Sequence, residues 1–285
     1  MAPRFVYRIL ALLVSALPLR VRRELWLYLA RLGRKRWPCE STAQRIPGGM
    51  YLKGGSRTRL TEGQAMRFVG ARTSLLLPVP VVVDNFALEG KTWLVMSRLP
   101  GHCLADVYPE ITPEIERRLS SQLSLLLAPL RAIPPPGHSV CGFDGGPVYC
   151  ERLALGSSPF GPFESVHAFH RFLLDRAGSL DVPEEEVERV QDTVRRAHSR
   201  PHRLCLTHND LGAHNVLVDD DWNVTGIIDW EACAWMPEYW ELTKGTFLLQ
   251  YRKGRWERIM TSVFPAYALE LEAERYIVKY RRRYT

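Results

Sequence analysis

Three polar side chains between residues 204 and 231 lie directly beside short apolar segments, where they could take part in chemistry. Asp210 and Asn215 stand five residues apart in a polar loop, and Asp229 ends an apolar run. A carboxylate can accept a proton from a hydroxyl group, and carboxylate and amide oxygens are hard ligands that suit Mg²⁺. The three residues could instead only cap a strand–turn–strand unit, but their joint spacing favours a chemical role.

The elements that carry these residues are expected to be short strands joined by tight turns. Residues 204–207, 216–218 and 224–228 are apolar runs of strand length, and the three aspartates at 219–221 mark a turn between the last two. A carboxylate that ends an apolar strand is not there for packing. We therefore expect the three polar groups to project from strand ends.

A second pair of charged residues lies in a β-rich segment nearer the N-terminus. Residues 50–52 predict a strand that ends in Lys53, and Glu62 falls in the first turn of the helix that follows. Thr61 and Gln64 form a possible capping box for this helix. The pattern therefore predicts that Lys53 lies on a strand and Glu62 on the helix that follows it.

Further strands are expected at residues 79–83 and 92–96, joined by a turn at Glu89–Gly90. The later part of the chain is mainly helical, and one helix begins at the N-cap residue Thr112 and its following proline. Residues 134–162 are rich in glycine and proline and longer than an ordinary connection, so we expect a functional loop there.

The segment 207–231 carries a resemblance to a known family. It reads T-H-N-D-L-x-x-x-N-V-L-V-D and later G-I-I-D-W-E. This form resembles the protein-kinase-like aminoglycoside phosphotransferase and choline kinase family, in particular its fungal small-molecule branch. The resemblance covers most of residues 45–280. It implies an α+β, two-lobed protein-kinase-like fold with a small β-rich N-lobe and a larger, mainly helical C-lobe.

The implied organisation has three parts. Residues 1–44 would form basic amphipathic helices, and residues 45–101 would form the kinase-like N-lobe and hinge. Residues 102–285 would form the helical C-lobe with the catalytic and metal-binding loops. In that C-lobe the resemblance implies that Asp210 is the catalytic base or orienting carboxylate.

The resemblance implies a role for the other motif residues as well. Asn215 and Asp229 would be the metal ligands, Asp229 the main one. Lys53 would hold the phosphates of the nucleotide and pair with Glu62. For these last two residues, an ordinary surface lysine and an ordinary first-turn glutamate are the alternative.

Residues 97–101 resemble the hinge between the two lobes of this family. Backbone groups near Ser97 and Leu99 would then contact adenine, with Met96 behind it, although the segment could also be no more than a turn. The chain departs from the family pattern in two places here. Ser97 stands where glutamate is usual, and no G-x-G-x-x-G precedes Lys53.

The function that the resemblance implies is transfer of the γ-phosphoryl group of ATP, with Mg²⁺, to a hydroxyl group of a small molecule. Trp230 replaces the Phe-Gly of protein kinases and no A-P-E segment follows, which disfavours a protein substrate. One alternative is a non-catalytic, nucleotide-binding sensor or scaffold. A secreted hydrolase is a third hypothesis, but it leaves the metal-ligand spacing unexplained. Neither the acceptor nor the oligomeric state follows from the sequence.

The composition indicates the broad class of the protein, its location and its partners. Among 285 residues, 46% are hydrophobic and 24% charged, as in globular proteins, and the six cysteines include no C-x-x-C. We therefore expect a reducing, cytoplasmic location. Residues 1–39 carry nine lysines or arginines against Glu24 alone, so their net charge of +8 exceeds the +7 of the whole chain. The remainder is nearly neutral, which does not favour nucleic acid as a partner.

The basic N-terminal segment has two amphipathic stretches. The apolar run from Ile9 to Leu19 is too short to span a bilayer. In the second stretch Val21, Leu25 and Leu29 recur at helical spacing. We expect helices that pack on the domain or make peripheral contact with a membrane through residues 1–36, with a signal or transit peptide as the alternative.

Overall fold

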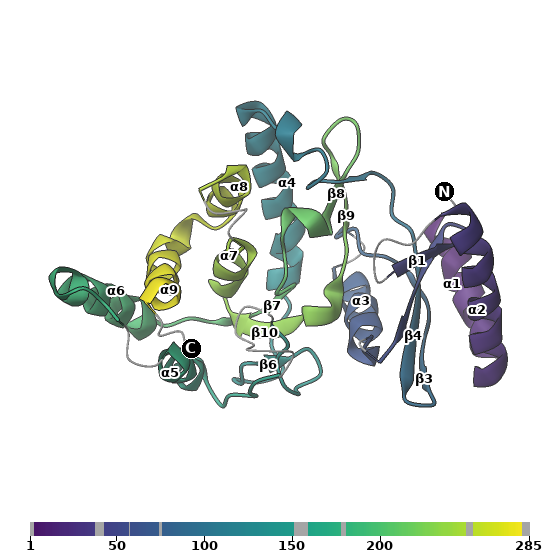
Figure 1. Ribbon diagram of the computed structural model, residues 1–285, viewed down its shortest axis with the longest axis horizontal. Coiled ribbons are helices and arrows are strands. Elements are labelled where there is room, and N and C mark those ends of the chain that lie inside the picture. Colours follow the sequence, from purple (N-terminus) through teal and green to yellow (C-terminus); the bar gives the residue numbers. More distant parts are fainter. Residues whose placement is uncertain are drawn as a thin grey trace. The chain divides into compact units, whose positions relative to one another are not determined.

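The computed structural model describes residues 3–37, 43–56, 58–73, 76–150, 159–177, 181–248 and 253–280. The chain forms two compact units (Figure 1). Unit 1 comprises Met1–Tyr108 with His214–Glu231, and unit 2 comprises Pro109–Ala213 with Ala232–Thr285. The predicted division into residues 1–44, 45–101 and 102–285 stays a prediction, and the structure adds that residues 214–231 pack with the first part of the chain.

Unit 1 is built on a four-stranded antiparallel sheet with helices on both faces (Figure 1). The strand order is β1-β2-β4-β3, so the strand that carries Lys53 is internal. Helix α3 covers one face, and helices α1 and α2 cover the other. The bounds are α1 Arg4–Ser15, α2 Leu19–Arg36, β1 Ala43–Ile46, β2 Met50–Gly55, α3 Leu60–Arg72, β3 Val82–Leu88 and β4 Lys91–Ser97.

Two local predictions in this unit were wrong. The strand expected at 79–83 lies at Val82–Leu88, because the buried Asp84 continues the strand instead of ending it. Asp84 is stabilised by an ion pair with Arg22 and by the indole Nε1 of Trp26, which donates at 2.7 Å. The capping box is also absent, since α3 begins at Leu60 with no side-chain cap.

The N-terminal helices pack on the sheet of unit 1, in agreement with the expectation that they pack on the domain. Tyr7 and Val14 of α1 and Trp26 and Ala30 of α2 are buried in one cluster with side chains of the sheet. Helix α2 approaches β1 so closely that a Cβ at Gly33 would lie 2.1 Å from the carbonyl oxygen of Arg45. Within the described part of the chain, no helix combines the length and hydrophobicity needed to span a bilayer.

A second small sheet in unit 1 carries the end of the central motif. Strands β5 (His102–Cys103), β8 (Val216–Val218) and β9 (Val224–Ile227) form an antiparallel sheet in the order β5-β8-β9. The predicted strands at 216–218 and 224–228 are confirmed to within one residue. The tight β8–β9 connection leaves the residues just before β8 and just after β9 at the same end of the hairpin.

Unit 2 is mainly helical, with a small sheet of order β6-β10-β7. Thr112 caps its long helix as predicted, because its hydroxyl accepts a hydrogen bond from the N–H of Ile115. Residues 151–158 of the predicted functional loop lie outside the described residues. The bounds are α4 Pro113–Arg131, β6 Cys141–Gly142, α5 Val166–Ala177, α6 Val187–Ser199, β7 Leu204–Thr207, β10 Ala234–Pro237, α7 Trp240–Gly245, α8 Arg255–Val263 and α9 Ala268–Tyr280.

Candidate functional site

In unit 1, Lys53 forms a bridge between two carboxylates that are distant in sequence. Its Nζ lies 2.8 Å from Oε1 of Glu62 on α3 and 2.6 Å from Oδ1 of Asp229 after β9. Lys53 and Glu62 are buried, while about a third of the Asp229 side chain is exposed. The alternative of an ordinary surface lysine and an ordinary first-turn glutamate is therefore excluded. The structure brings these three predicted residues together.

The charges of this cluster are strongly coupled. Burial alone lowers the pKa of Lys53, but the carboxylates of Glu62 and Asp229 outweigh burial and raise it above its ordinary value. For Glu62, burial raises the pKa above that of an ordinary carboxyl group, although Lys53 opposes the shift. Lys53 is consequently held as an ammonium ion with a fixed position, which suits contact with an anionic ligand.

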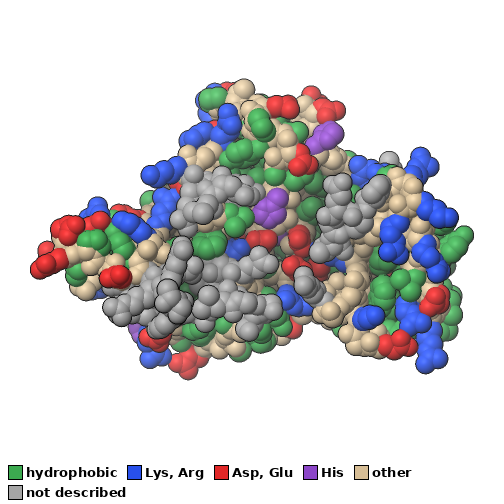
Figure 2. All heavy atoms as spheres, in the orientation of Figure 1, with side chains coloured by type: hydrophobic (Ala, Val, Ile, Leu, Met, Phe, Trp, Pro, Cys, Tyr) green, Lys and Arg blue, Asp and Glu red, His purple; other side chains and the backbone are tan. Residues whose placement is uncertain are grey.

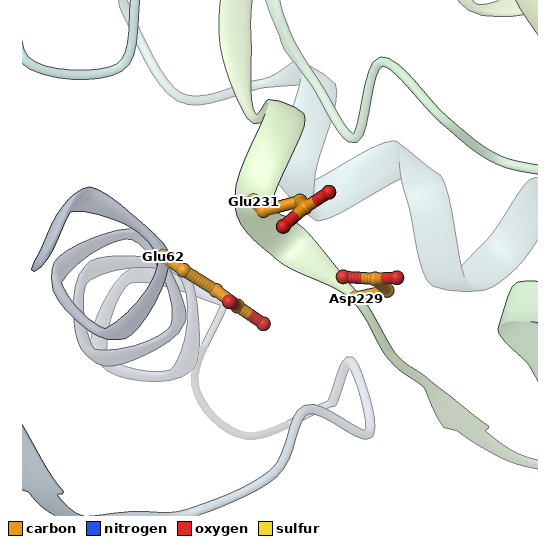
Figure 3. A group of neighbouring side chains, drawn as sticks. All are labelled: Glu62, Asp229 and Glu231. Atoms are coloured by element: carbon orange, nitrogen blue, oxygen red, sulfur yellow. The ribbon is translucent and has the colours of Figure 1, made fainter. Parts of the chain in front are cut away.

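A third carboxylate, which the sequence analysis missed, lies beside this pair. Oxygens of Glu62, Asp229 and Glu231 all lie within 4.8 Å of one another (Figure 3). Glu231 sits in the short 3₁₀ turn Trp230–Ala232 that directly follows Asp229. The only sequence signal was its place two residues after Asp229. A group of carboxylate oxygens at this separation fits a hard divalent cation such as Mg²⁺.

The β8–β9 hairpin positions Asn215 and Asp229 at one end. The N–H of Ile228 donates to the carbonyl oxygen of Asn215 at 3.0 Å, and Asp229 follows directly. Asp229 has a φ of 66°, in the left-handed region that few residues other than glycine, asparagine and aspartate adopt. Asn215 is buried. Both predicted metal ligands therefore belong to one rigid hairpin.

The predicted hinge residues differ in what they can offer a ligand. Ser97 is engaged within the fold, because its N–H donates to Val81 at 2.9 Å and its Oγ accepts from the N–H of Val81 at 2.8 Å. Met96 is buried. The N–H of Leu99 has no hydrogen-bond partner among the described residues. Within the described part of the chain, the backbone N–H of Leu99 is therefore the one of these two that a ligand could accept from.

In unit 2, the loop that carries Asp210 is held by hydrogen bonds to α7. The buried carboxylate of Glu241 accepts from the backbone N–H groups of His208 at 2.6 Å and Asn209 at 3.1 Å. Trp240 donates through Nε1 to Oδ1 of Asn209 at 2.7 Å. Residues 234–237 form β10, and the aromatic residues Tyr239 and Trp240 that follow it are buried.

Asp210 itself is paired with a lysine that the sequence analysis missed. Nζ of the buried Lys244 donates to Oδ1 of Asp210 at 2.7 Å. Helix α7 lies so close to the loop that a Cβ at Gly245 would be 2.6 Å from the carbonyl oxygen of Leu211. Lys244 therefore orients the carboxylate of Asp210. About a third of the Asp210 side chain is exposed, so the carboxylate is also accessible.

Glu241 leads to a prediction about stability and pH. Burial raises the pKa of Glu241 to about 7, against an ordinary value of 4.5. Because folding raises this pKa, the protonated form of Glu241 contributes stability that is fully present below the pKa of the unfolded state. That contribution is lost as pH rises through the higher pKa of the folded state. Between pH 6 and pH 8.5 we expect wild type to lose about 1 kcal/mol more stability than Glu241→Gln.

Thermal unfolding of the two proteins at both pH values measures this difference. The variant is expected to be less stable at both pH values, because the NH₂ group of its amide would face a backbone N–H and could not accept its hydrogen bond. Its control is Glu238→Gln, since Glu238 is mostly buried as well but its charge is paired with Arg203. Equal pH dependence in wild type and Glu241→Gln would contradict the assignment of this raised pKa.

The fold matches that of aminoglycoside phosphotransferases, which have a kinase-like architecture. The profile of the phosphotransferase enzyme family matches residues 54–276, and the chain belongs to this family. A search of curated proteins finds no match. The α+β fold and the family resemblance expected from the sequence are therefore confirmed.

Solved structures with a similar fold are aminoglycoside phosphotransferases. A thermostable mutant of aminoglycoside phosphotransferase APH(4)-Ia in apo form is 18% identical with a TM-score of 0.57, covering 83% of this chain and 79% of that one. Another mutant of it, in a ternary complex with AMP-PNP and hygromycin B, is 16% identical with a TM-score of 0.57, covering 88% of each chain. The type VIII aminoglycoside-3'-phosphotransferase is 19% identical with a TM-score of 0.50, covering 88% and 97%. At these identities the likeness concerns the fold.

Proposed function

We propose that this protein is an ATP- and Mg²⁺-dependent kinase that phosphorylates a hydroxyl group of a small molecule. The observation that carries the proposal is the buried bridge from Lys53 to Glu62 and Asp229. A buried lysine held between two carboxylates is costly unless its charge is used or fully paired, and phosphate groups are well suited to it. Membership of the phosphotransferase family supports the same reaction class.

The residues of unit 1 fit the nucleotide and its metal. Lys53 would hold phosphate oxygens, and the free N–H of Leu99 would donate to adenine. Asn215 and Asp229 would ligate Mg²⁺, and Glu231 could add a third oxygen. When bound, Mg²⁺ neutralises charge on the phosphate oxygens and so favours transfer. Ser97 and Met96 would shape the adenine region from within the fold.

Asp210 is proposed as the carboxylate that orients the acceptor hydroxyl and accepts its proton. Its partial exposure and its contact with Lys244 leave one oriented, accessible carboxylate on a loop held by Glu241. The solved relatives include a complex of aminoglycoside phosphotransferase APH(4)-Ia with hygromycin B, which supports a small-molecule acceptor.

The test is ATP turnover by the wild-type protein with a panel of aminoglycosides, amino alcohols and polyols, with and without Mg²⁺. We expect Mg²⁺-dependent stabilisation by ATP in thermal unfolding, and ADP release that depends on one class of acceptor. Stabilisation by ATP without turnover of any acceptor would favour the nucleotide-binding sensor or scaffold. A protein that neither binds nor consumes ATP would contradict the proposal.

A further inference from the structure

Helix α1 has two apolar faces, and only one of them is explained by packing in the fold. Tyr7 and Val14 are buried against the sheet of unit 1. Three residues at helical spacing on the other side are instead exposed, with exposed fractions of 61% for Phe5, 52% for Ile9 and 73% for Leu12. Side chains at these spacings form one stripe along a helix. The stripe lies on the surface of the molecule.

Exposed apolar residues also occur in the helix connection and along α2. Val21, Tyr28 and Leu32 are exposed and fall on one face of that helix, opposite the buried Trp26 and Ala30. Among the described residues, ten of the fourteen large hydrophobic side chains that are exposed belong to this region, so the exposure is local. The apolar strip is Phe5, Val6, Ile9, Leu12, Leu13, Leu17, Leu19, Val21, Tyr28 and Leu32.

Positive charge accompanies the apolar strip. Arg8, Arg20, Arg31, Arg34 and Lys35 are exposed and form no ion pair with any described residue. Glu24 is the only acidic residue of α1 and α2, and it pairs with Arg23. Figure 2 shows hydrophobic and basic side chains next to one another over this part of unit 1. The surface therefore combines an apolar strip with unneutralised positive charge.

We propose that α1 and α2 bind the surface of a bilayer that contains anionic lipids. The apolar strip would enter the boundary between headgroups and acyl chains, while the arginines and Lys35 would contact lipid phosphates and carboxylates. The positive charge of the surface favours an anionic bilayer over a second copy of the chain as the binding partner. A second copy of the chain would bring the same positive charge to the interface, and the two faces would repel each other. The contact would be peripheral, along the exposed faces of α1 and α2.

The proposal is tested by co-sedimentation of the full chain with vesicles of phosphatidylcholine alone or mixed with phosphatidylserine. We expect binding to the mixed vesicles that weakens at high salt, because salt screens the attraction between arginines and anionic headgroups. Leu12→Glu is expected to reduce binding by about 10-fold or more, since it sets a carboxylate in the strip that should meet acyl chains.

Leu125→Glu is the matched control, because Leu125 is 76% exposed on α4, close to the 73% of Leu12, and lies outside the apolar strip. It should bind vesicles as wild type does. Arg34→Glu with Lys35→Glu should weaken binding only to vesicles that contain phosphatidylserine. Both target sites are exposed, and unchanged thermal unfolding would confirm that the variants fold.

Three results would overturn the proposal. The first is absence of wild-type binding to mixed vesicles, and the second is equal binding by wild type and Leu12→Glu. The third is a dimer in analytical ultracentrifugation that Leu12→Glu converts to a monomer, without lipid binding by wild type, because the strip would then be an interface between copies. None of these readouts depends on ATP or on an acceptor, so the result is independent of the proposed kinase activity.

Discussion

Replacement of Asp229 by asparagine is expected to abolish Mg²⁺-dependent nucleotide binding and to reduce phosphoryl transfer by about 10³-fold or more. The variant loses the charge that should attract the cation and one of the two carboxylates that hold Lys53. Asparagine, like aspartate, tolerates the left-handed backbone found at this position, so the hairpin should keep its conformation. The measurement is calorimetric titration of ATP with and without Mg²⁺.

Asp221→Asn provides the control for this experiment. Asp221 is exposed in the turn of the same hairpin, so the substitution changes the same charge at a place remote from Lys53. We expect it to bind nucleotide as wild type does. Glu231→Gln should give a smaller loss than Asp229→Asn, because Asp229 pairs directly with Lys53 and is the proposed main metal ligand. Full Mg²⁺-dependent binding by Asp229→Asn would exclude Asp229 as the main metal ligand.

Asp210→Asn is expected to reduce the turnover rate by about 10²–10⁴-fold, while the affinity for Mg²⁺–ATP stays within a few-fold of wild type. The amide oxygen can still accept the hydrogen bond from Lys244, so the buried ammonium keeps a polar partner. Only the ability to accept a proton is lost. Single-turnover kinetics with a saturating acceptor separates this effect from a change in nucleotide binding.

Asp192→Asn is the matched control in unit 2, because Asp192 lies on the exposed face of α6 and pairs with Arg195 and Arg196. Its turnover should equal that of wild type. Lys244→Met removes the partner of Asp210 and should also slow turnover, through loss of the carboxylate's orientation. If Asp210→Asn were as active as wild type with a normal Mg²⁺ requirement, another group would have to accept the proton.

Several features were predictable because their signals are local. The strands 204–207, 216–218 and 224–227 follow from apolar runs and an Asp-rich turn, and Thr112 is a typical N-cap. The predicted end of β3 was wrong because a buried Asp84 breaks the apolar pattern, and its partners Arg22 and Trp26 lie about 60 residues earlier. A sequence pattern does not reveal that a distant helix neutralises a carboxylate.

The sequence by itself determined the family, the fold class and most of the residues proposed for chemistry, since the motif around Asp210, Asn215 and Asp229 keeps its residue types at close spacing. Other features were decided by the tertiary structure alone. Lys53 meets Asp229 across 176 positions, and Lys244 meets Asp210 across 34.

The exposed strip of α1 and α2 also became visible only in the fold, because amphipathic spacing does not tell which apolar face the sheet covers. The physical reason is common to all these cases. A local pattern reports the preference of a segment, whereas a charge pair or an exposed face depends on which distant segment packs against it.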